Sequence, residues 1–126
     1  MKFSASMALL SVLLCNVVAA REIEVGTILI CDTEQQAERV TALLQGDEQN
    51  MANAVNTINT EEKGLPVCGL DEAEYVRGTD VGTIRSERQT YHIAPILLVG
   101  IIRRNAVRPV QQNVYFSAFQ IDERVA

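Results

Sequence analysis

The first twenty residues carry the hydrophobic pattern of an export signal rather than that of a folded element. Met1–Lys2 gives a short positive start, Ala8–Leu14 is an apolar run, and Val18–Ala20 supplies the small residues at which signal peptidase cuts. We therefore expect residues 1–20 to be cleaved and the protein to be exported, either to the periplasm or into the medium.

Two alternatives for this segment are less favoured. An uncleaved anchor is disfavoured because Met7–Ala20 contains Ser11 and Asn16 and is shorter than the roughly 20 apolar residues that cross a bilayer. Lipid attachment at Cys15 is disfavoured because a small residue usually precedes a lipidated cysteine, and here it is Leu14. After cleavage we expect no stable insertion into a membrane.

The pattern beyond the signal predicts a strand followed by a helix. Ile23–Cys31 is rich in β-branched residues and ends in a continuous apolar run, which is typical of a buried strand. Asp32 and Thr33 then supply N-cap chemistry, with Gln35 and Gln36 at capping-box spacing from them.

Two amphipathic helices are predicted, the first ending at Gly46. Asp47 and Glu48 precede the second, where negative charge complements a helix N-terminus. We interpret both apolar stripes as core packing rather than as ligand-binding surfaces. They comprise Ala37, Val40, Leu43 and Leu44 in the first helix and Met51, Ala54, Val55 and Ile58 in the second.

After the polar loop Thr60–Pro66 the pattern turns to strands. Ile96–Ile102 is apolar on both faces, which predicts a central strand, whereas Pro95 is expected to break its strand or to lie on an edge. The predicted strands are Ala73–Arg77, Val81–Arg85, Gln89–Arg103 and Val114–Asp122, with connections at 78–80, 86–88 and 105–113.

These elements predict a single α+β domain over residues 21–126. An N-terminal strand and a helical pair are followed by a four-stranded antiparallel meander, because short connections favour pairing in sequence order. We expect a strongly curved sheet or an SH3-like, partly open barrel. An open sheet with helices on one face is the other possible closure.

Composition adds a disulfide to this picture. The 126-residue chain is 48% hydrophobic and 21% charged, an ordinary globular balance, and signal cleavage leaves two of its three cysteines, Cys31 and Cys68. An even pair in an oxidising compartment predicts a Cys31–Cys68 disulfide. A catalytic or metal-binding thiol is disfavoured, because the two are not in C-x-x-C spacing and one histidine alone exists to join them.

The order of these motifs resembles small exported bacterial proteins of unknown function that contain one cysteine pair. The resemblance covers nearly all of the mature chain, and it implies no reaction and no catalytic residues. It is carried by the first strand with Cys31, the helical segment, Cys68–Gly69, Tyr75–Gly78, Ile96–Gly100 and Tyr115–Phe119.

The charged and polar residues exclude several functions. The formal charge of −5 argues against a nucleic-acid binder, which needs a concentrated positive field. Neither Ser86 nor Ser117 lies in a G-x-S-x-G elbow, and no sequence pattern of a phosphate-binding loop or a metal site occurs, so no cofactor is expected. We interpret Asp71–Glu74 as a solvated acidic turn rather than as a calcium site.

Two sets of residues remain as candidates. Arg103, Arg104 and Arg108 cluster before the last predicted strand, where planar guanidinium groups suit an anionic ligand or partner. The alternative for them is ordinary surface charge on a solvated hairpin. The lone histidine, His92, has no acidic neighbour in sequence, so catalysis there would need partners delivered by the fold.

Two function classes follow. The favoured class is an exported, non-catalytic module that binds a protein or a cell-envelope component through an exposed sheet edge or through the arginine connection. An inhibitor or immunity-type protein would be a subclass of it. The alternative is a small secreted enzyme or effector with its site around His92, which a cleft joining His92 to a carboxylate and an arginine would favour.

Overall fold

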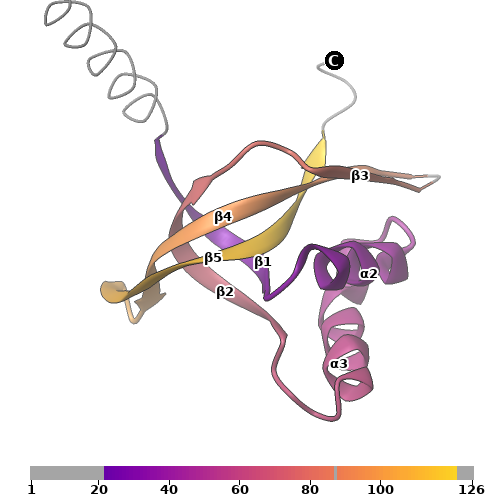
Figure 1. Ribbon diagram of the computed structural model, residues 1–126, viewed down its shortest axis with the longest axis horizontal. Coiled ribbons are helices and arrows are strands. Elements are labelled where there is room, and N and C mark those ends of the chain that lie inside the picture. The colour runs from indigo at the N-terminus through magenta and orange to yellow at the C-terminus, as the bar shows by residue number, and fades with distance from the viewer. Residues whose placement is uncertain (1–21, 87, 122–126) are drawn as a thin grey trace, which may run out of the picture.

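The computed structural model describes residues 22–86 and 88–121, which form one curled sheet and a helical segment (Figure 1). The order of strand, two helices and antiparallel sheet confirms the predicted α+β class; the expected signal peptide lies outside the described residues. The elements are β1 (Ile23–Cys31), α2 (Glu34–Leu44), the 3-10 helix η1 (Glu48–Asn50), α3 (Met51–Glu61), β2 (Cys68–Arg77), β3 (Gly82–Arg85), β4 (Thr90–Arg103) and β5 (Ala106–Ile121).

The strands β1 and β2 form a continuous antiparallel ladder, from Ile23 opposite Val76 to Cys31 opposite Cys68. Because β2 follows the full length of β1, it begins at Cys68 rather than at the predicted Ala73. Cys31 and Cys68 face each other at the end of this ladder and form the predicted disulfide, with Cα atoms 4.1 Å apart. The bond therefore closes the helical segment at its base.

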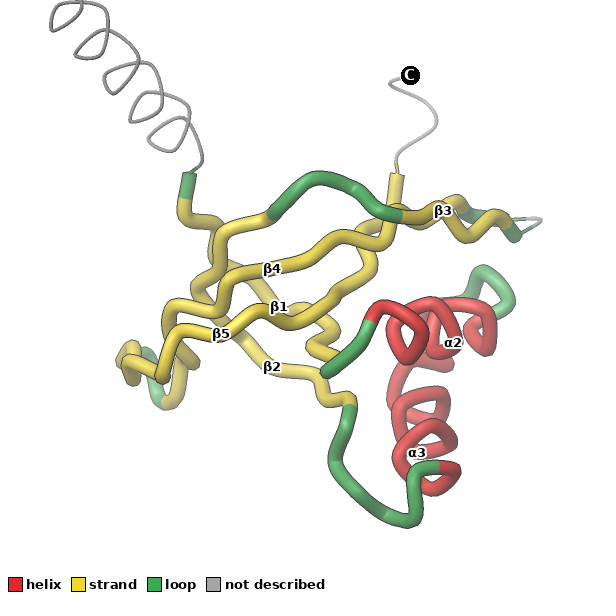
Figure 2. Tube along the Cα trace, viewed as in Figure 1, coloured by secondary structure: helices red, strands yellow, loops and turns green. Residues whose placement is uncertain are grey.

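The remaining pairings curl the sheet into a partly closed ring (Figure 2), as the predicted curved sheet requires. β4 pairs with β5 on one side and with both β2 and β3 on the other. β2 and β3 lie end to end along β4, so two of the predicted meander strands share one place in the ring. The ring is completed by a single bridge between β1 and β5, from Cys31 to Phe116.

Pro95 lies inside β4 and does not break it, nor is β4 an edge strand. Its carbonyl accepts a hydrogen bond of 2.8 Å from Gly78 N, so the proline nitrogen, which points the same way, faces the gap between β2 and β3. Because neither β2 nor β3 lies opposite the proline nitrogen, its missing N–H costs the sheet no ladder hydrogen bond. The central position predicted for Ile96–Ile102 is confirmed.

The predicted connection at 105–113 is wrong, because β5 already begins at Ala106. Arg104 and Asn105, with φ of 52° and 64°, form a two-residue turn of the left-handed kind that suits a hairpin. The residues beyond the turn stay in β5. The register of β5 with β4 shifts between Leu98 and Gly100, where β5 has more residues than β4.

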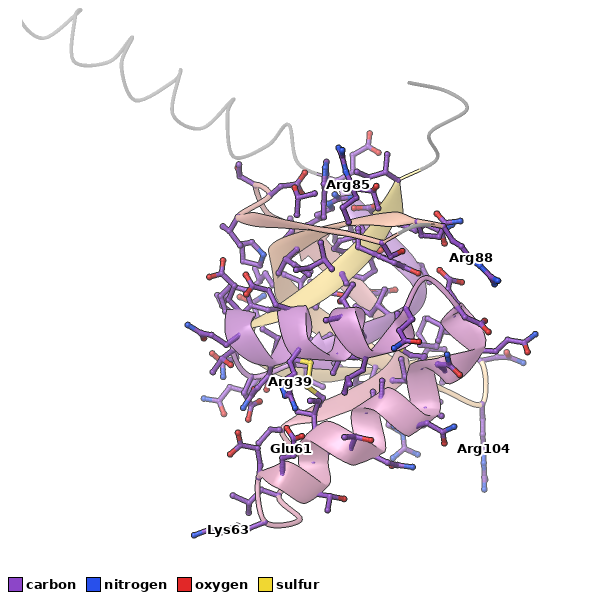
Figure 3. All side chains as sticks on the ribbon, turned by 90° about the vertical axis from the view of Figure 1, so that its right-hand side faces the viewer. Arg39, Glu61, Lys63, Arg85, Arg88 and Arg104 are labelled. Carbon is purple, nitrogen blue, oxygen red and sulfur yellow. A yellow bond between two sulfur atoms is a disulfide. The ribbon has the colours of Figure 1, made fainter. Side chains whose placement is uncertain are left out.

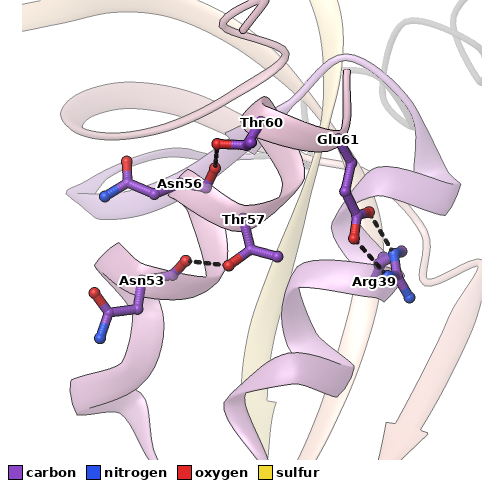
Figure 4. Close-up of polar contacts among 6 residues, drawn as sticks. All are labelled: Arg39, Asn53, Asn56, Thr57, Thr60 and Glu61. Carbon is purple, nitrogen blue, oxygen red and sulfur yellow. Dashed lines mark hydrogen bonds and ion pairs between the residues drawn. The ribbon is translucent and has the colours of Figure 1, made fainter. Parts of the chain in front are cut away.

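Both helices begin and end close to their predicted bounds. Thr33 caps α2 in a capping box with Gln36, and the left-handed Gln45 ends the helix just before Gly46. Arg39 of α2 makes two hydrogen bonds, of 2.9 and 2.7 Å, to Glu61 of α3, which link the helices on their exposed side (Figure 4).

The sheet carries a core on each face, because alternate residues of a strand point to opposite sides. Figure 1 shows both helices on one side of the sheet. The helix-side core contains Leu29, Cys31, Ala37, Val40, Leu44, Ala54, Val55, Ile58, Cys68, Tyr91 and Ile93. The inner core, enclosed by the curl, contains Ile28, Ala73, Tyr75, Ile96 and Leu98. None of the helices in the described part is long and apolar enough to span a membrane.

Candidate functional site

The fold gives His92 the acidic neighbour that its sequence context lacks. His92 lies on β4, between Thr83 of β3 and Phe119 of β5. Its Nδ1 is 2.5 Å from Oδ2 of Asp80, and Oδ1 of Asp80 accepts a hydrogen bond of 2.9 Å from Nη2 of Arg77. The guanidinium carbon of Arg77 also lies 4.1 Å from the centre of the Phe119 ring. Arg77, Asp80 and His92 therefore form one cluster of ionisable side chains.

The connection between β2 and β3 brings Asp80 to this place. Gly78 and Val81 both donate backbone hydrogen bonds of 2.8 Å to β4, to Pro95 O and Ile93 O, which hold the connection against the strand. A Cβ at residue 78 would lie 2.8 Å from Pro95 Cγ and 3.1 Å from Pro95 O, so the close approach depends on glycine.

The charge of Asp80 is stabilised where it lies. Partial burial acts to raise the pKa of Asp80, but the hydrogen bond and charge of Arg77, together with His92, outweigh burial and lower the pKa. The aspartate is therefore held as a carboxylate that can orient the imidazole.

A carboxylate and an arginine beside His92 are the arrangement that favours the enzyme class, yet the serine and cysteine side chains of the described residues are occupied or enclosed. Ser86 Oγ donates to Gln89 O at 2.8 Å, and Ser117 is completely buried with no hydrogen-bond partner. Cys31 and Cys68 are joined to each other. Nucleophilic catalysis by a serine or cysteine next to His92 is not supported by this geometry.

The three candidate arginines lie on the β4–β5 hairpin, but they do not form a shared pocket. Nη1 of Arg103 is 2.5 Å from Oδ1 of Asp71, and this hydrogen bond and the aspartate charge raise the pKa of Arg103. Arg104 is in the exposed turn and points away from the body of the molecule (Figure 3). Arg108 is exposed on β5, opposite Ile101. The hairpin thus presents two exposed cations and one that is paired.

The acidic run Asp71–Glu74 is part of the strand β2 and is not the predicted turn. Alternation along the strand separates Asp71, which bonds Arg103, from Glu72 and Glu74 on the other face. Within residues 22–86 and 88–121, no group of three or more histidine, cysteine or acidic side chains converges as a metal site would require.

A groove between β1 and β5 is the feature that the sequence did not reveal. The two strands share the bridge at Cys31–Phe116 and no other pairing in the described chain, so their facing edges are unpaired beyond it. The groove has a volume of about 440 Å³. Its walls are Gly26–Leu29 of β1 and Ala118–Gln120 of β5, and Glu48, Met51, Leu70, Tyr75 and Tyr91 complete it.

Backbone polar groups of β1 point into this groove. Asp32 N donates to Val67 O, on the side of β2, and the direction of backbone groups alternates from residue to residue. Cys31 faces β5 accordingly, and so do Leu29 and Thr27, whose N–H and C=O have no strand partner in the described residues. Thr27 is exposed, so its groups are open to a further strand, whereas Leu29 is only 2% exposed and its groups are enclosed.

Tyr91 adds an unpartnered hydroxyl to the groove. Tyr91 is only 2% exposed, and its hydroxyl has no hydrogen-bond partner among the residues that the structure describes. Burial, followed by the charges of Glu48 and Asp47, raises the pKa of Tyr91. A second hollow of about 550 Å³ lies beside Gln45, Asp47 and Arg88, but none of the described residues that line it belongs to a strand.

No family model, curated protein or solved structure matches this chain. The fold and the groove are therefore the basis for any statement about function.

Proposed function

We propose that the protein is an exported, disulfide-stabilised, non-catalytic binding module that receives an extended segment of a protein or cell-envelope partner in the groove between β1 and β5. The observation that carries this proposal is the pair of unpaired strand edges that flank the groove. An exposed strand edge is a template for strand addition, in which backbone hydrogen bonds provide affinity and side-chain pockets provide specificity.

The groove is suited to a strand rather than to a compact ligand. An added strand could hydrogen-bond to the exposed Thr27 on one side while its side chains alternate between the groove and solvent. On the groove side they would meet apolar and aromatic surface from Met51, Leu70 and Phe119. The β1 edge also lacks the prolines and lysines that commonly protect edge strands.

Binding is tested with strand-forming peptides about seven residues long, the usual length of a short strand. We expect saturable binding, followed by fluorescence anisotropy, to the disulfide-closed protein. Thr27→Pro removes one N–H from the unpaired edge and should abolish binding, whereas Thr27→Val keeps the N–H and should retain it. Failure of every peptide to bind, or equal binding to both variants, would contradict the proposal.

Export is supported by the signal pattern of residues 1–20 and by the cysteine pair, which needs an oxidising environment to close. The intact mass of the protein recovered from its native compartment tests both features. We expect loss of residues 1–20 and a deficit of two hydrogens relative to the reduced chain. A full-length mass with free thiols would refute export.

The arginine hairpin is proposed as a second contact for an anionic part of the partner. Arg104 and Arg108 are exposed and suited to carboxylate or phosphate groups, whereas Arg103 is held by Asp71. Replacement of all three arginines by serine should weaken partner binding, mainly through its rate of association. Unchanged association would remove the hairpin from the binding surface.

The second candidate function is a hydrolytic enzyme in which His92 acts as a general base. The contact between His92 and Asp80 is the observation that favours it, since a carboxylate at Nδ1 orients the imidazole. His92→Ala separates the two functions. Peptide binding that survives this substitution supports the binding module, and loss of a hydrolytic activity with binding intact would support the enzyme.

A further inference from the structure

The strongest further clue is the buried hydroxyl of Tyr91. A buried hydroxyl normally has a hydrogen-bond partner, because leaving it unpaired in the protein interior destabilises the folded state. Within residues 22–86 and 88–121 the hydroxyl of Tyr91 has none, although Tyr91 lines an open groove. An unpaired polar group at a groove is satisfied when an occupant supplies the missing partner.

The electrostatic surroundings indicate the charge of that partner. Glu48 is the one charged side chain among the described residues that line the groove, and it is exposed. Asp47, the preceding residue, caps η1 by accepting a hydrogen bond of 3.0 Å from Gln49 N. Both carboxylates act on Tyr91. The hydroxyl therefore lies in a negative field with no cation among the groove-lining residues.

We infer that the groove selects extended segments carrying a lysine or arginine, whose cationic head pairs with Glu48 near Asp47 and donates a hydrogen bond to the Tyr91 hydroxyl oxygen. This inference rests on the proposed function and names the partner class for the same groove. A basic side chain supplies both a positive charge, which the carboxylates attract, and an N–H donor for the phenol oxygen.

The hydroxyl is closed to solvent in the unoccupied protein, so a side chain that shields it must shift when the segment enters. Glu48 and Met51 are the flexible groove-lining residues of the helical segment that can do this. Methionine adapts its shape readily, and the long stem of lysine or arginine can pack against it while the head reaches the carboxylates.

The test uses three peptides that differ only at the central position: Ser-Val-Thr-X-Thr-Val-Ser, with lysine, methionine or glutamate as X. We expect the lysine peptide to bind about tenfold more tightly than the methionine peptide, as one charge-assisted contact allows. The glutamate peptide should bind more weakly than either. High salt should reduce the difference between lysine and methionine, since the mouth of the groove is open to screening.

Two variants test whether Glu48 and Tyr91 cause the preference for lysine. Glu48→Gln removes the charge and Tyr91→Phe removes the hydroxyl, and each should reduce the lysine preference several-fold while the methionine peptide still binds. Glu62→Gln, an exposed acid outside the groove, is the matched control and should change nothing.

The outcomes separate this inference from the proposed function. Equal binding of the three peptides would overturn the charge selection and leave the groove as a general strand acceptor. Binding of none would overturn the proposed function itself. A lysine preference that persists in both variants would place the selecting group elsewhere. Self-association that saturating peptide abolishes would assign the groove to a second copy of this chain and also overturn the inference.

Discussion

The two cores of this protein are built differently, although they share one sheet. The helix-side core is enclosed by α2, α3 and the sheet, contains completely buried side chains such as Val40 and Leu44, and is tied by the disulfide. The inner core has fewer buried residues, and its ring is completed by a single bridge at Phe116. The comparison places most of the stabilising contacts in the helix-side core. The groove lies where the two cores meet, because Tyr91 belongs to the helix-side core and Tyr75 to the inner core.

Opening the disulfide should produce the largest effect, and it tests whether the helix-side core depends on it. Closing a loop with a sequence separation of 37 restricts the unfolded chain, so its loss should lower the free energy of unfolding by about 4 kcal/mol. Urea denaturation with and without reductant measures this. A Cys31→Ala, Cys68→Ala double variant is the control, because reductant should not alter it further. An unchanged midpoint on reduction would contradict the prediction.

A matched pair of leucine substitutions compares the two cores directly. Leu44→Ala should lower the free energy of unfolding by about 4 kcal/mol, because its completely enclosed site leaves a cavity that cannot collapse. Leu98→Ala, at 6% exposure beside the open ring, should cost about 2 kcal/mol. Thermal and urea denaturation report both values. A larger loss at Leu98 would reverse the ranking of the two cores.

Tyr91→Phe tests whether the unpaired hydroxyl in the groove destabilises the folded protein. Removing a buried hydroxyl that lacks a partner should raise the free energy of unfolding by about 1 kcal/mol. Tyr115→Phe, at a partly exposed tyrosine, is the control and should be nearly neutral. A loss of stability in Tyr91→Phe would mean that the hydroxyl is satisfied in solution, and it would remove the basis for the charge preference of the groove.

The smallest expected effect concerns Asp80, at the edge of the inner core. Its folded-state pKa is lowered, so its pairing contributes stability above the unfolded pKa and loses it as the pH falls through the folded pKa. Asp80 is 36% exposed, so Asp80→Asn should cost less than about 1 kcal/mol at neutral pH and nothing in strong acid. Glu72→Gln is the control. A cost for Asp80→Asn that grows as the pH falls would contradict this sign.

Local sequence signals predicted those features that depend on neighbouring residues. Thr33 and Gln36 define the start of α2, and the apolar run of β4 predicts a central strand, because capping and burial on both faces leave a direct pattern. The Cys31–Cys68 pair followed from counting cysteines. Each of these predictions required no knowledge of which strands pair.

The predictions that failed depended on long-range pairing. Ala106–Asn113 has no regular alternation of apolar and polar residues and contains Pro109, so its local pattern predicted a loop, yet pairing with β4 makes it a strand. The neighbour of His92 could not be found because Asp80 reaches it only through the register of β3 with β4. The groove follows from the separation of β1 and β5, which no local residue pattern records.

The position of the disulfide also has a consequence for modularity. The Cα atoms of Cys31 and Cys68 are 4.1 Å apart, close to the about 3.8 Å between consecutive residues of a chain. The helical segment between the two cysteines therefore leaves the β1–β2 ladder and returns to it at almost one point. A change in the length of this segment would therefore leave the register of β1 with β2 intact, provided that Val40, Leu44 and Ile58 still complete the helix-side core.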